Sequence, residues 1–364
     1  MAKLVFGIQV ALVVVFAVLW NPLDFFIYRL GGQVVGDGAR LYLEQQAAHW
    51  FTYTPFAAVL FEPLSFVPLV PARVLWELAS VGAFVVACRQ WVPRRYVPWA
   101  VAGGLMLEPV WHSLFLGQVN LILLAVVAVD FRRLATGRSA GIGIGIAAAI
   151  KLTPGIFIVL LLAAGRVRPA VIAGVTFVAA TGAAWLVAPD ASLVYWRDTF
   201  YDSSRVGVPY VSNQSPFGAL TRVLDDVGAW YYVIPLMLLV FGVFVGYARR
   251  EDFLAVFAVA GLTGLLVSPI SWSHHWVWAL PALVVLVRDG HRTLAIAATT
   301  VLTLSPMWAT RLVDHPNDLW YLLPIRNAYL LVGLVLLVAL CPGVLPGHSA
   351  RVRTPRRSLQ EARQ

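Results

Sequence analysis

The sequence predicts an all-α, polytopic membrane protein, and its composition and hydropathy carry that prediction. Of the 364 residues, 60% are hydrophobic and only 12% are charged, whereas a soluble globular domain carries about 25% charged residues. The apolar residues also form blocks near the length of about 20 residues that a helix needs to cross a bilayer. Together these features exclude a cytosolic enzyme, a nucleic-acid-binding protein and a disordered chain.

Apolar runs predict about twelve transmembrane or half-membrane helices, several of them too short to cross a bilayer without tilting. The runs are Leu4–Trp20, Val74–Cys88, Tyr96–Val110, Val119–Val129, Gly141–Ile150, Gly155–Ala164, Val171–Val187, Tyr231–Tyr247, Phe253–Ile270, Trp276–Val287, Thr293–Trp308 and Ala328–Leu345. We interpret residues 1–346 as one integral-membrane domain. Residues 347–364 form a basic tail, which we expect to be cytoplasmic, disordered and close to anionic lipid headgroups.

The basic residues indicate how the chain is oriented, because cytoplasmic loops carry an excess of Lys and Arg. With a cytoplasmic N-terminus, the inner loops hold 13 basic residues and the tail holds five, which is 18 of the 27 in the chain. Every substantial loop then lies outside, at 21–73, 188–230 and 309–326, with a short loop at 111–118 and a corner at 268–275. We therefore expect a multi-pass plasma-membrane protein with both termini in the cytoplasm and its functional site outside. The net charge of +9 reflects orientation and does not indicate a nucleic-acid partner.

The segment Lys151-Leu-Thr-Pro154 interrupts an apolar stretch from Gly141 to Ala164. If the stretch were one helix, every later loop would change sides and the charge rule would fail. Two half-length helices that meet in a hairpin near Lys151 preserve the rule, and broken helices at membrane depth line cavities. A lysine there suits an anionic group such as a lipid-linked phosphate. The alternative is an internal salt bridge with Glu108.

The glycines of the same stretch predict close helix packing. Gly141 and Gly145 have the GxxxG spacing that brings two membrane helices together. With Gly143 they superficially match a phosphate-binding glycine loop, but no strand precedes them, so we do not interpret them as a nucleotide site.

Asp24 lies just beyond the first apolar run, in the segment Asp24-Phe-Phe-Ile-Tyr28-Arg29. A carboxylate at a partly dehydrated interface can have a raised pKa and act as a general base. The alternative is a helix cap or an ordinary interfacial acid.

The segment Ser268-Pro-Ile-Ser271-Trp272-Ser273-His274-His275 is the second cluster of polar residues at a predicted membrane boundary. A zinc site would need more ligands at helical spacing, and adjacent histidines splay apart, so we expect no metal there. Hydrogen bonding of the histidines to a phosphate or sugar, with Trp272 beside a sugar ring, is the interpretation we favour. An aromatic belt with incidental histidines is the alternative.

Four side-chain amides are candidates for hydrogen bonding to sugar hydroxyls, although an amide alone does not indicate a particular ligand. Gln118 and Asn120 precede and open the fourth apolar run, and Asn213 and Gln214 lie in the large outer loop at 188–230.

Six short motifs occur in order along most of the chain. They are Asp24-Phe-Phe-Ile-Tyr28, Phe51-Thr-Tyr53-Thr-Pro55-Phe56-Ala-Ala58, Gly117-Gln118-Val-Asn120, Ala149-Ile150-Lys151-Leu-Thr-Pro154, Asn213-Gln214-Ser215 and Ser268-Pro269-Ile-Ser271-Trp272-Ser273-His274-His275. In this order and spacing they resemble glycosyltransferase family 87. The family comprises GT-C-fold, polyprenyl-phosphate-mannose-dependent α-(1→2)-mannosyltransferases of actinobacteria, which extend phosphatidylinositol mannosides and lipomannan. One departure is Thr54, where the family pattern leads us to expect proline.

The resemblance implies an inverting transfer of mannose in cell-envelope glycolipid synthesis. The donor is polyprenyl-phosphate-mannose, the acceptor is a mannoside or glycolipid, and no metal or other cofactor takes part. Asp24 is then the base, and Lys151 with His274 or His275 binds the donor phosphate. Residues implied in substrate binding are Tyr28, Arg29, Tyr53, Gln118, Asn120, Asn213, Gln214 and Trp272.

Two other readings stay open. A transporter or flippase of lipid-linked sugars would also suit a broken hairpin with a buried lysine. The concentration of loops on one face favours an enzyme, because a carrier needs access from both sides. Within the enzymes, a GT-C protein that uses another lipid-linked sugar is the second alternative.

Overall fold

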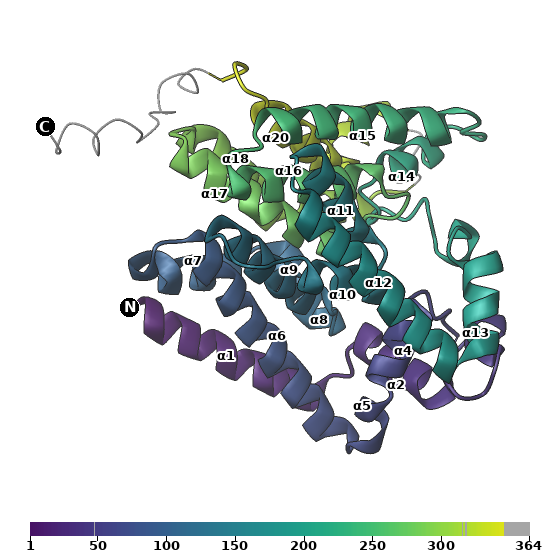
Figure 1. Cartoon of the computed structure of the whole chain (residues 1–364). Coiled ribbons are helices and arrows are strands. Elements are labelled where there is room, and N and C mark those ends of the chain that lie inside the picture. Colours follow the sequence, from purple (N-terminus) through teal and green to yellow (C-terminus); the bar gives the residue numbers. More distant parts are fainter. Residues whose placement is uncertain (47, 315, 317–318, 346–364) are drawn as a thin grey trace, which may run out of the picture.

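The computed structural model describes residues 1–46, 48–314, 316 and 319–345 (Figure 1), so the tail expected at 347–364 lies outside the described residues. Regular structure in the described part is helical throughout, and β-type pairing there is limited to two isolated bridges, Gln46 with His49 and Asn213 with Trp272. The all-α prediction is confirmed.

The helices vary widely in length. The longer ones are α1 (Ala2–Leu19), α2 (Leu23–Val34), α6 (Leu69–Trp91), α9 (Asn120–Ala135), α12 (Val167–Val187), α15 (Trp230–Ala248), α16 (Phe253–Val267), α18 (Arg292–Leu304) and α20 (Ala328–Ala339). The shorter ones are α3 (Arg40–Leu43), α4 (Pro55–Phe61), α5 (Pro63–Phe66), α7 (Val97–Gly104), α8 (Glu108–Leu116), α10 (Ile142–Ile150), α11 (Ile156–Ala163), α13 (Pro189–Val194), α14 (Pro216–Thr221), α17 (Leu280–Arg288) and α19 (Leu323–Arg326). The 3-10 segments used below are η2 (Thr153–Gly155), η5 (Ser273–Ala279) and η6 (Pro306–Leu312).

The protein is embedded in a membrane, but the expected count of about twelve spanning or half-spanning helices is not confirmed. Among the described residues, five helices are long and apolar enough to cross: Ala2–Leu19, Leu69–Trp91, Val167–Val187, Trp230–Ala248 and Arg292–Leu312. A sixth results if Trp320–Arg326 and Ala328–Ala339, which are bent by 63°, form one span. Several predicted runs are shorter as helices: α10, α11 and α17 have only 9, 8 and 9 residues.

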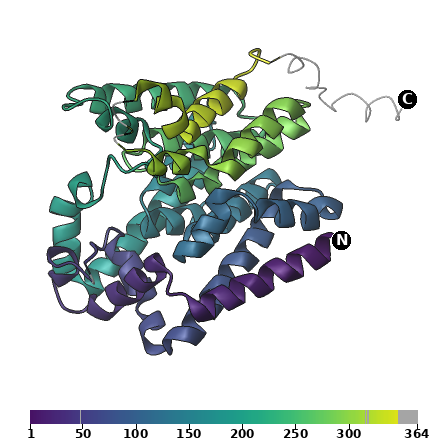
Figure 2. The ribbon, with the colours of Figure 1, turned by 180° about the vertical axis from the view of Figure 1, so that it is seen from behind.

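The long helices are stacked, and the short helices of the loops gather at one end. Figures 1 and 2 show α1 and α6 at one edge, α15 and α20 at the opposite edge, and α9 and α10 between them. Helix α2 and the short helices α4, α5 and α13 lie at the end of the molecule remote from the N-terminus. The two longest predicted loops therefore converge in space.

Helix α16 forms the centre of the core. Twelve of its fifteen residues are buried, which is the pattern of a helix surrounded by others. It packs against α9, α11, α15, α17 and α20. The ring of Phe257 stacks on Phe131 with centroids 4.9 Å apart and contacts Phe157 at 5.3 Å, so the central helix joins the two halves of the stack.

The prediction of a single run at Tyr96–Val110 followed by a loop at 111–118 is wrong. Helix α7 ends at Gly104 and a new helix, α8, extends from Glu108 to Leu116. Two adjacent glycines weaken the end of α7, and Pro109 suits the first turn of a helix, so the chain restarts there.

The predicted hairpin at Lys151 is confirmed. Helix α10 ends at Ile150, Lys151 is extended (φ −143°, ψ 127°), and α11 starts only after η2. A Cβ on Gly141 would meet Pro169 and Ala173, and one on Gly145 would meet Ala173 and Phe177. Helices α10 and α12 therefore run in the same direction, which requires α11 between them to run back.

We predict that Gly145→Ala destabilises the protein, because the added Cβ would lie 2.4 Å from the Ala173 carbonyl oxygen. Overpacking of this kind costs about 1–3 kcal/mol and should lower the thermal unfolding temperature in detergent. The matched control is Gly174→Ala on α12, where a Cβ meets nothing within 4 Å. Equal unfolding temperatures for the two variants would contradict the close α10–α12 contact.

Candidate functional site

The candidate residues from five separate segments meet in one cluster. Asp24 and Tyr28 are on α2, and Tyr53 lies two residues before α4. Gln118 and Asn120 stand where α9 begins, Lys151 lies at the helix break, and the two histidines are on η5. The hydrogen bonds and charge interactions below connect them.

Two buried tyrosines hold Gln118 beside Asp24. The hydroxyl of Tyr28 lies 2.7 Å from that of Tyr53. Both hydroxyls donate to the Gln118 side-chain oxygen, at 2.9 and 2.8 Å. This leaves the amide nitrogen of Gln118 to donate to the Asp24 carboxylate, with which it makes a side-chain hydrogen bond. Asp24 is thus positioned by a chain of neutral donors.

The environment of Asp24 raises the pKa of its carboxyl to about 6. Burial is the largest cause, because it disfavours the charged form. The hydrogen bond with Gln118 and the charges of Lys151, His112 and His49 act in the opposite direction. A carboxyl with this pKa is ionised at neutral pH yet basic enough to accept a proton from a positioned hydroxyl.

Lys151 lies in the same cluster and interacts with Asp24 through charge, without forming a salt bridge in the described part of the chain. Its Nζ is 2.9 Å from His275 Nε2 and donates to Asn120 Oδ1 at 3.2 Å. It also lies 5.3 Å from the centroid of the Tyr53 ring. The salt bridge with Glu108, offered as an alternative above, is not found: no ion pair involving Lys151 occurs among the described residues. Its charge is therefore available to an anionic ligand.

Thr54 supports the break at Lys151. Its hydroxyl caps α4 by accepting from Ala57 N, and Pro55 follows at the first helical position. The same hydroxyl donates to the carbonyl oxygens of Ala149 and Ile150, which lie at the end of α10. The threonine that replaces the expected proline thus bonds backbone groups exposed by the break.

The two adjacent histidines are both buried, and His274 has unused ring nitrogens. Its carbonyl oxygen accepts from Ser113 Oγ and Asn120 Nδ2, both at 3.1 Å. Neither ring nitrogen has a hydrogen-bond partner in the described part of the chain. Its ring is perpendicular to that of His275, with centroids 4.7 Å apart. No group of three or more His, Cys, Asp or Glu within the described ranges could hold a metal ion.

Glu108 and His112, one turn apart on α8, extend the cluster and were not predicted as site residues. His112 Nδ1 lies 2.8 Å from Glu108 Oε1, and its ring contacts that of His274 at 5.4 Å. The i, i+4 spacing is the signal in the sequence. It was missed because this segment was expected to be a loop.

Arg29 is engaged with backbone. Its guanidinium donates to the carbonyl oxygens of Leu64 at 2.5 Å, Val67 at 2.6 Å and Ser65 at 2.9 Å. The side chain therefore holds α5 and the residue after it against α2, and the role in substrate binding implied by the resemblance remains a prediction.

Asn213 and Gln214 are fully buried and join loops to one another. Asn213 Nδ2 donates to Val208 O at 3.0 Å and to Pro269 O at 3.2 Å, and its Oδ1 accepts from Ser271 N at 2.9 Å. Gln214 makes comparable bonds with the Val211 and Arg326 carbonyls and with Tyr329 N. Trp272 pairs with Asn213 through the isolated bridge and contacts the Tyr210 ring at 6.2 Å. These contacts position the segment that precedes the histidines.

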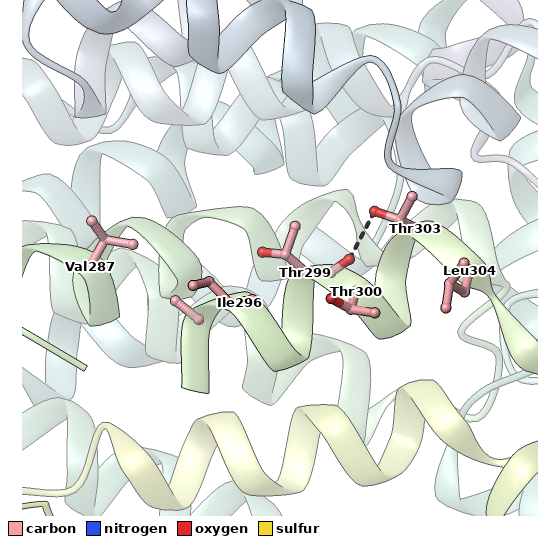
Figure 3. A pocket seen from close by; sticks show the side chains of 7 residues that line it. Val287, Ile296, Thr299, Thr300, Thr303 and Leu304 are labelled. Carbon is pink, nitrogen blue, oxygen red and sulfur yellow. Dashed lines mark hydrogen bonds between the residues drawn. The ribbon is translucent and has the colours of Figure 1, made fainter. Parts of the chain in front are cut away.

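Two surface cavities lie away from this cluster. One, of about 310 Å³, is lined by α17 and α18 (Figure 3), where the Thr303 hydroxyl donates to Thr299 O at 2.9 Å. The other, of about 480 Å³, is lined by α6, α9 and α10 and includes Asp130. Asp130 Oδ2 accepts from Gly141 N and Ile144 N, so this carboxylate caps the start of α10.

Comparison with known proteins identifies the family. The sequence profile of glycosyltransferase family 87 matches residues 51–269, which is more than half of the chain. The chain belongs to glycosyltransferase family 87. The matched region of this family 87 glycosyltransferase includes Tyr53, Gln118 and Lys151, whereas Asp24 and the two histidines lie beyond its ends.

Mycobacterial relatives agree with this assignment. A polyprenol-phosphate-mannose-dependent α-(1-2)-phosphatidylinositol mannoside mannosyltransferase of Mycobacterium tuberculosis is 32% identical over 309 residues, covering 76% of this chain and 72% of the relative. A phosphatidylinositol pentamannoside mannosyltransferase of the same species, with the same named donor and linkage, is 35% identical over 258 residues, or 66% of this chain and 58% of the relative. A Mycolicibacterium smegmatis protein described like the first is 29% identical over 320 residues, 77% and 72% of the two chains. No solved structure matches the glycosyltransferase significantly.

We predict that Asn213→Ala lowers the thermal stability of the glycosyltransferase. The change removes an amide that satisfies buried backbone groups, and each unsatisfied group costs about 1–3 kcal/mol. The exposed Asn21 provides the control, since Asn21→Ala leaves no buried group unpaired. Detergent-solubilised variants compared by thermal unfolding would contradict this reading if Asn213→Ala unfolded at the same temperature as Asn21→Ala.

Proposed function

We propose that this enzyme is an inverting mannosyltransferase that moves mannose from polyprenyl-phosphate-mannose to a phosphatidylinositol mannoside or lipomannan-type acceptor. The relatives are named for this donor, for phosphatidylinositol mannoside substrates and for the α-(1-2) linkage. The observation that carries the proposal is that one carboxylate, Asp24, and one lysine that forms no salt bridge within the described ranges, Lys151, lie in a single cluster. Inverting transfer from a lipid phosphate needs both.

The proposed reaction is a single displacement. Asp24 accepts the proton of the acceptor hydroxyl as that oxygen attacks the anomeric carbon of mannose. The bond from that carbon to the phosphate oxygen breaks, and its electron pair leaves with the polyprenyl phosphate. Lys151, with His274 or His275, stabilises the phosphate by charge and hydrogen bonding. Preorganised donors at a departing oxygen are an effective form of electrostatic catalysis.

The rest of the cluster is proposed to bind the two sugars. Tyr53, Gln118 and Asn120 adjoin Asp24 or Lys151 directly. The same role is proposed for Arg29, Asn213, Gln214 and Trp272, whose contacts described above also shape the site. No divalent metal is required, because Lys151 supplies the positive charge and the two buried histidines supply hydrogen bonds.

We further propose a GT-C-like architecture of about twelve full and half spans, with both termini in the cytoplasm and the site on the outer face of the plasma membrane. The excess of basic residues in the loops expected inside supports this orientation. The gathering of α2, α4, α5 and α13 at one end of the molecule (Figures 1 and 2) supports a one-sided site. A transporter of lipid-linked sugars would not need a carboxylate with a raised pKa beside its lysine.

We predict that Asp24→Asn reduces mannose transfer at least ~100-fold, since general bases contribute about 10²–10⁴-fold. The assay uses purified protein, radiolabelled polyprenyl-phosphate-mannose and a panel of mannoside acceptors, and donor binding is measured in parallel. Asp37→Asn is the matched control, because Asp37 is an exposed carboxylate on the same outer segment. Full transfer by Asp24→Asn would remove Asp24 as the base, and no transfer by the wild type with any acceptor would contradict the proposed function.

The pH dependence of kcat/KM should follow the Asp24 carboxyl. A general base must be ionised to accept a proton. We therefore expect kcat/KM to fall about tenfold per pH unit as the pH drops below the Asp24 pKa of about 6. Above that pH it should level off. The donor is a phosphodiester and does not titrate in this range. A flat profile from pH 7 to pH 5 would show that another group accepts the proton.

A further inference from the structure

A fully buried carboxylate lies behind the phosphate-binding residues proposed above. Glu108 Oε1 accepts from His112 Nδ1 and Ser273 Oγ, both at 2.8 Å, and from Trp308 Nε1 at 3.0 Å. Its Oε2 accepts from the Tyr329 hydroxyl at 2.9 Å. Four donors from α8, η5, η6 and α20 are an arrangement that suits an ionised carboxylate in a buried place.

This carboxylate fixes the orientation of His112. Nδ1 faces Glu108 and also lies 2.9 Å from Ser273 Oγ. The imidazole ring is held edge-on between Trp308, at 5.5 Å, and His274, at 5.4 Å. A carboxylate that accepts from one imidazole nitrogen orients the ring and provides a counter-charge for an imidazolium.

The second ring nitrogen of His112 is free to face a ligand. No hydrogen bond to Nε2 occurs among the described residues, and the side chain is 13% exposed while Glu108 is fully buried. The charge of His112 acts on Asp24, as does that of Lys151. His112 thus belongs to the same cluster as Asp24, Lys151 and His274. The ring nitrogens of His274 are also without hydrogen-bond partners in the described chain.

We propose that His112 is a further ligand of the donor phosphate, which its Nε2–H binds directly, and that Glu108 is the residue that positions it. This inference rests on the proposed function, because it takes the lipid-linked phosphate of the donor as the anion.

In the transfer step, the electron pair of the broken bond between the anomeric carbon and oxygen ends on the phosphate. The proton of the acceptor hydroxyl ends on Asp24. The His112 proton stays on Nε2 and donates a charge-assisted hydrogen bond to a phosphate oxygen, and Glu108 balances the imidazolium charge from behind. The attraction between the imidazolium and the phosphate is strongest when the phosphate carries the full negative charge of the leaving group. This contact therefore favours the products of bond cleavage over the intact donor.

The test compares two lipids that differ only in the phosphate. Binding of polyprenyl phosphate and of the uncharged polyprenol is measured on the full-length protein in detergent. His112→Phe keeps an aromatic ring against Trp308 and removes both nitrogens, and His112→Ala is the second variant. Each should weaken polyprenyl phosphate binding about 10- to 100-fold and change polyprenol binding less than about twofold. His291→Ala, at the N-terminus of α18, is the control that should change neither.

The outcomes separate the two proposals. If the wild type binds both lipids equally, the phosphate donor of the proposed function is wrong. If the wild type prefers the phosphate and the His112 variants keep that preference, or lose both lipids together, the inference about His112 is overturned.

Glu108 is tested through its coupling to His112. Glu108→Gln should weaken polyprenyl phosphate binding, and the double variant Glu108→Gln with His112→Phe should bind no worse than His112→Phe alone, because Glu108 acts through the histidine. In transfer assays Glu108→Gln should raise the KM for the donor and leave the KM for the acceptor unchanged. Additive losses in the double variant, or equal changes in both KM values, would show that Glu108 only supports the fold.

Discussion

The break in the backbone at Lys151 is the constraint on which the rest of the site depends. A helix that stops inside an apolar assembly leaves carbonyl groups without intrahelical partners, and such groups must be satisfied within the protein. Thr54 bonds the carbonyls of Ala149 and Ile150. The ammonium group of Lys151 is bonded by Asn120 and His275. Each of these partners belongs to a different segment, so stabilising the break also assembles the site.

The site combines polar residues that are hydrogen-bonded to one another with a small number of groups that can still bind a ligand. Tyr28, Tyr53 and Gln118 satisfy one another and hold Asp24. Glu108 likewise fixes four donors and orients His112. What remains for a ligand is one carboxylate, one ammonium group and the imidazoles. Fixed polar groups of this kind need little reorganisation as charge develops on a departing phosphate.

The sequence was informative where chemistry and topology constrained the same residues. The hairpin at Lys151 followed from the charge rule and Pro154, and both signals are local enough to be visible without coordinates. The identity of Asp24 and Lys151 as neighbours followed from the scarcity of charge and from the family resemblance. The ends of α1, α12 and α15 lie within about four residues of the ends of the predicted apolar runs.

What could not be predicted depends on tertiary contacts. Most of helix α8 was predicted to be a loop, because hydropathy does not show that a new helix starts at Glu108 and Pro109. The pairing of Glu108 with His112, and of both with Ser273 and Trp308, was therefore hidden. Asn213 and Gln214 were identified as polar residues of interest, but their bonds to loop carbonyls form only between distant segments. The number of spans stays a prediction, because apolar runs do not reveal where a helix bends or ends.

The glycine contact between α10 and α12 has a consequence for how the enzyme sits in its lipid. Gly145 leaves no space against Ala173, so the short helix that ends at Lys151 is attached to a helix of 21 residues that is long enough to span. Helices of this length respond to bilayer thickness by tilting. We therefore expect the depth of the Lys151 ammonium group in the membrane to depend on bilayer thickness. A donor anchored in the same bilayer keeps its phosphate near the headgroups. The thickness of one bilayer would then act on the depth of both the ammonium group and the donor phosphate.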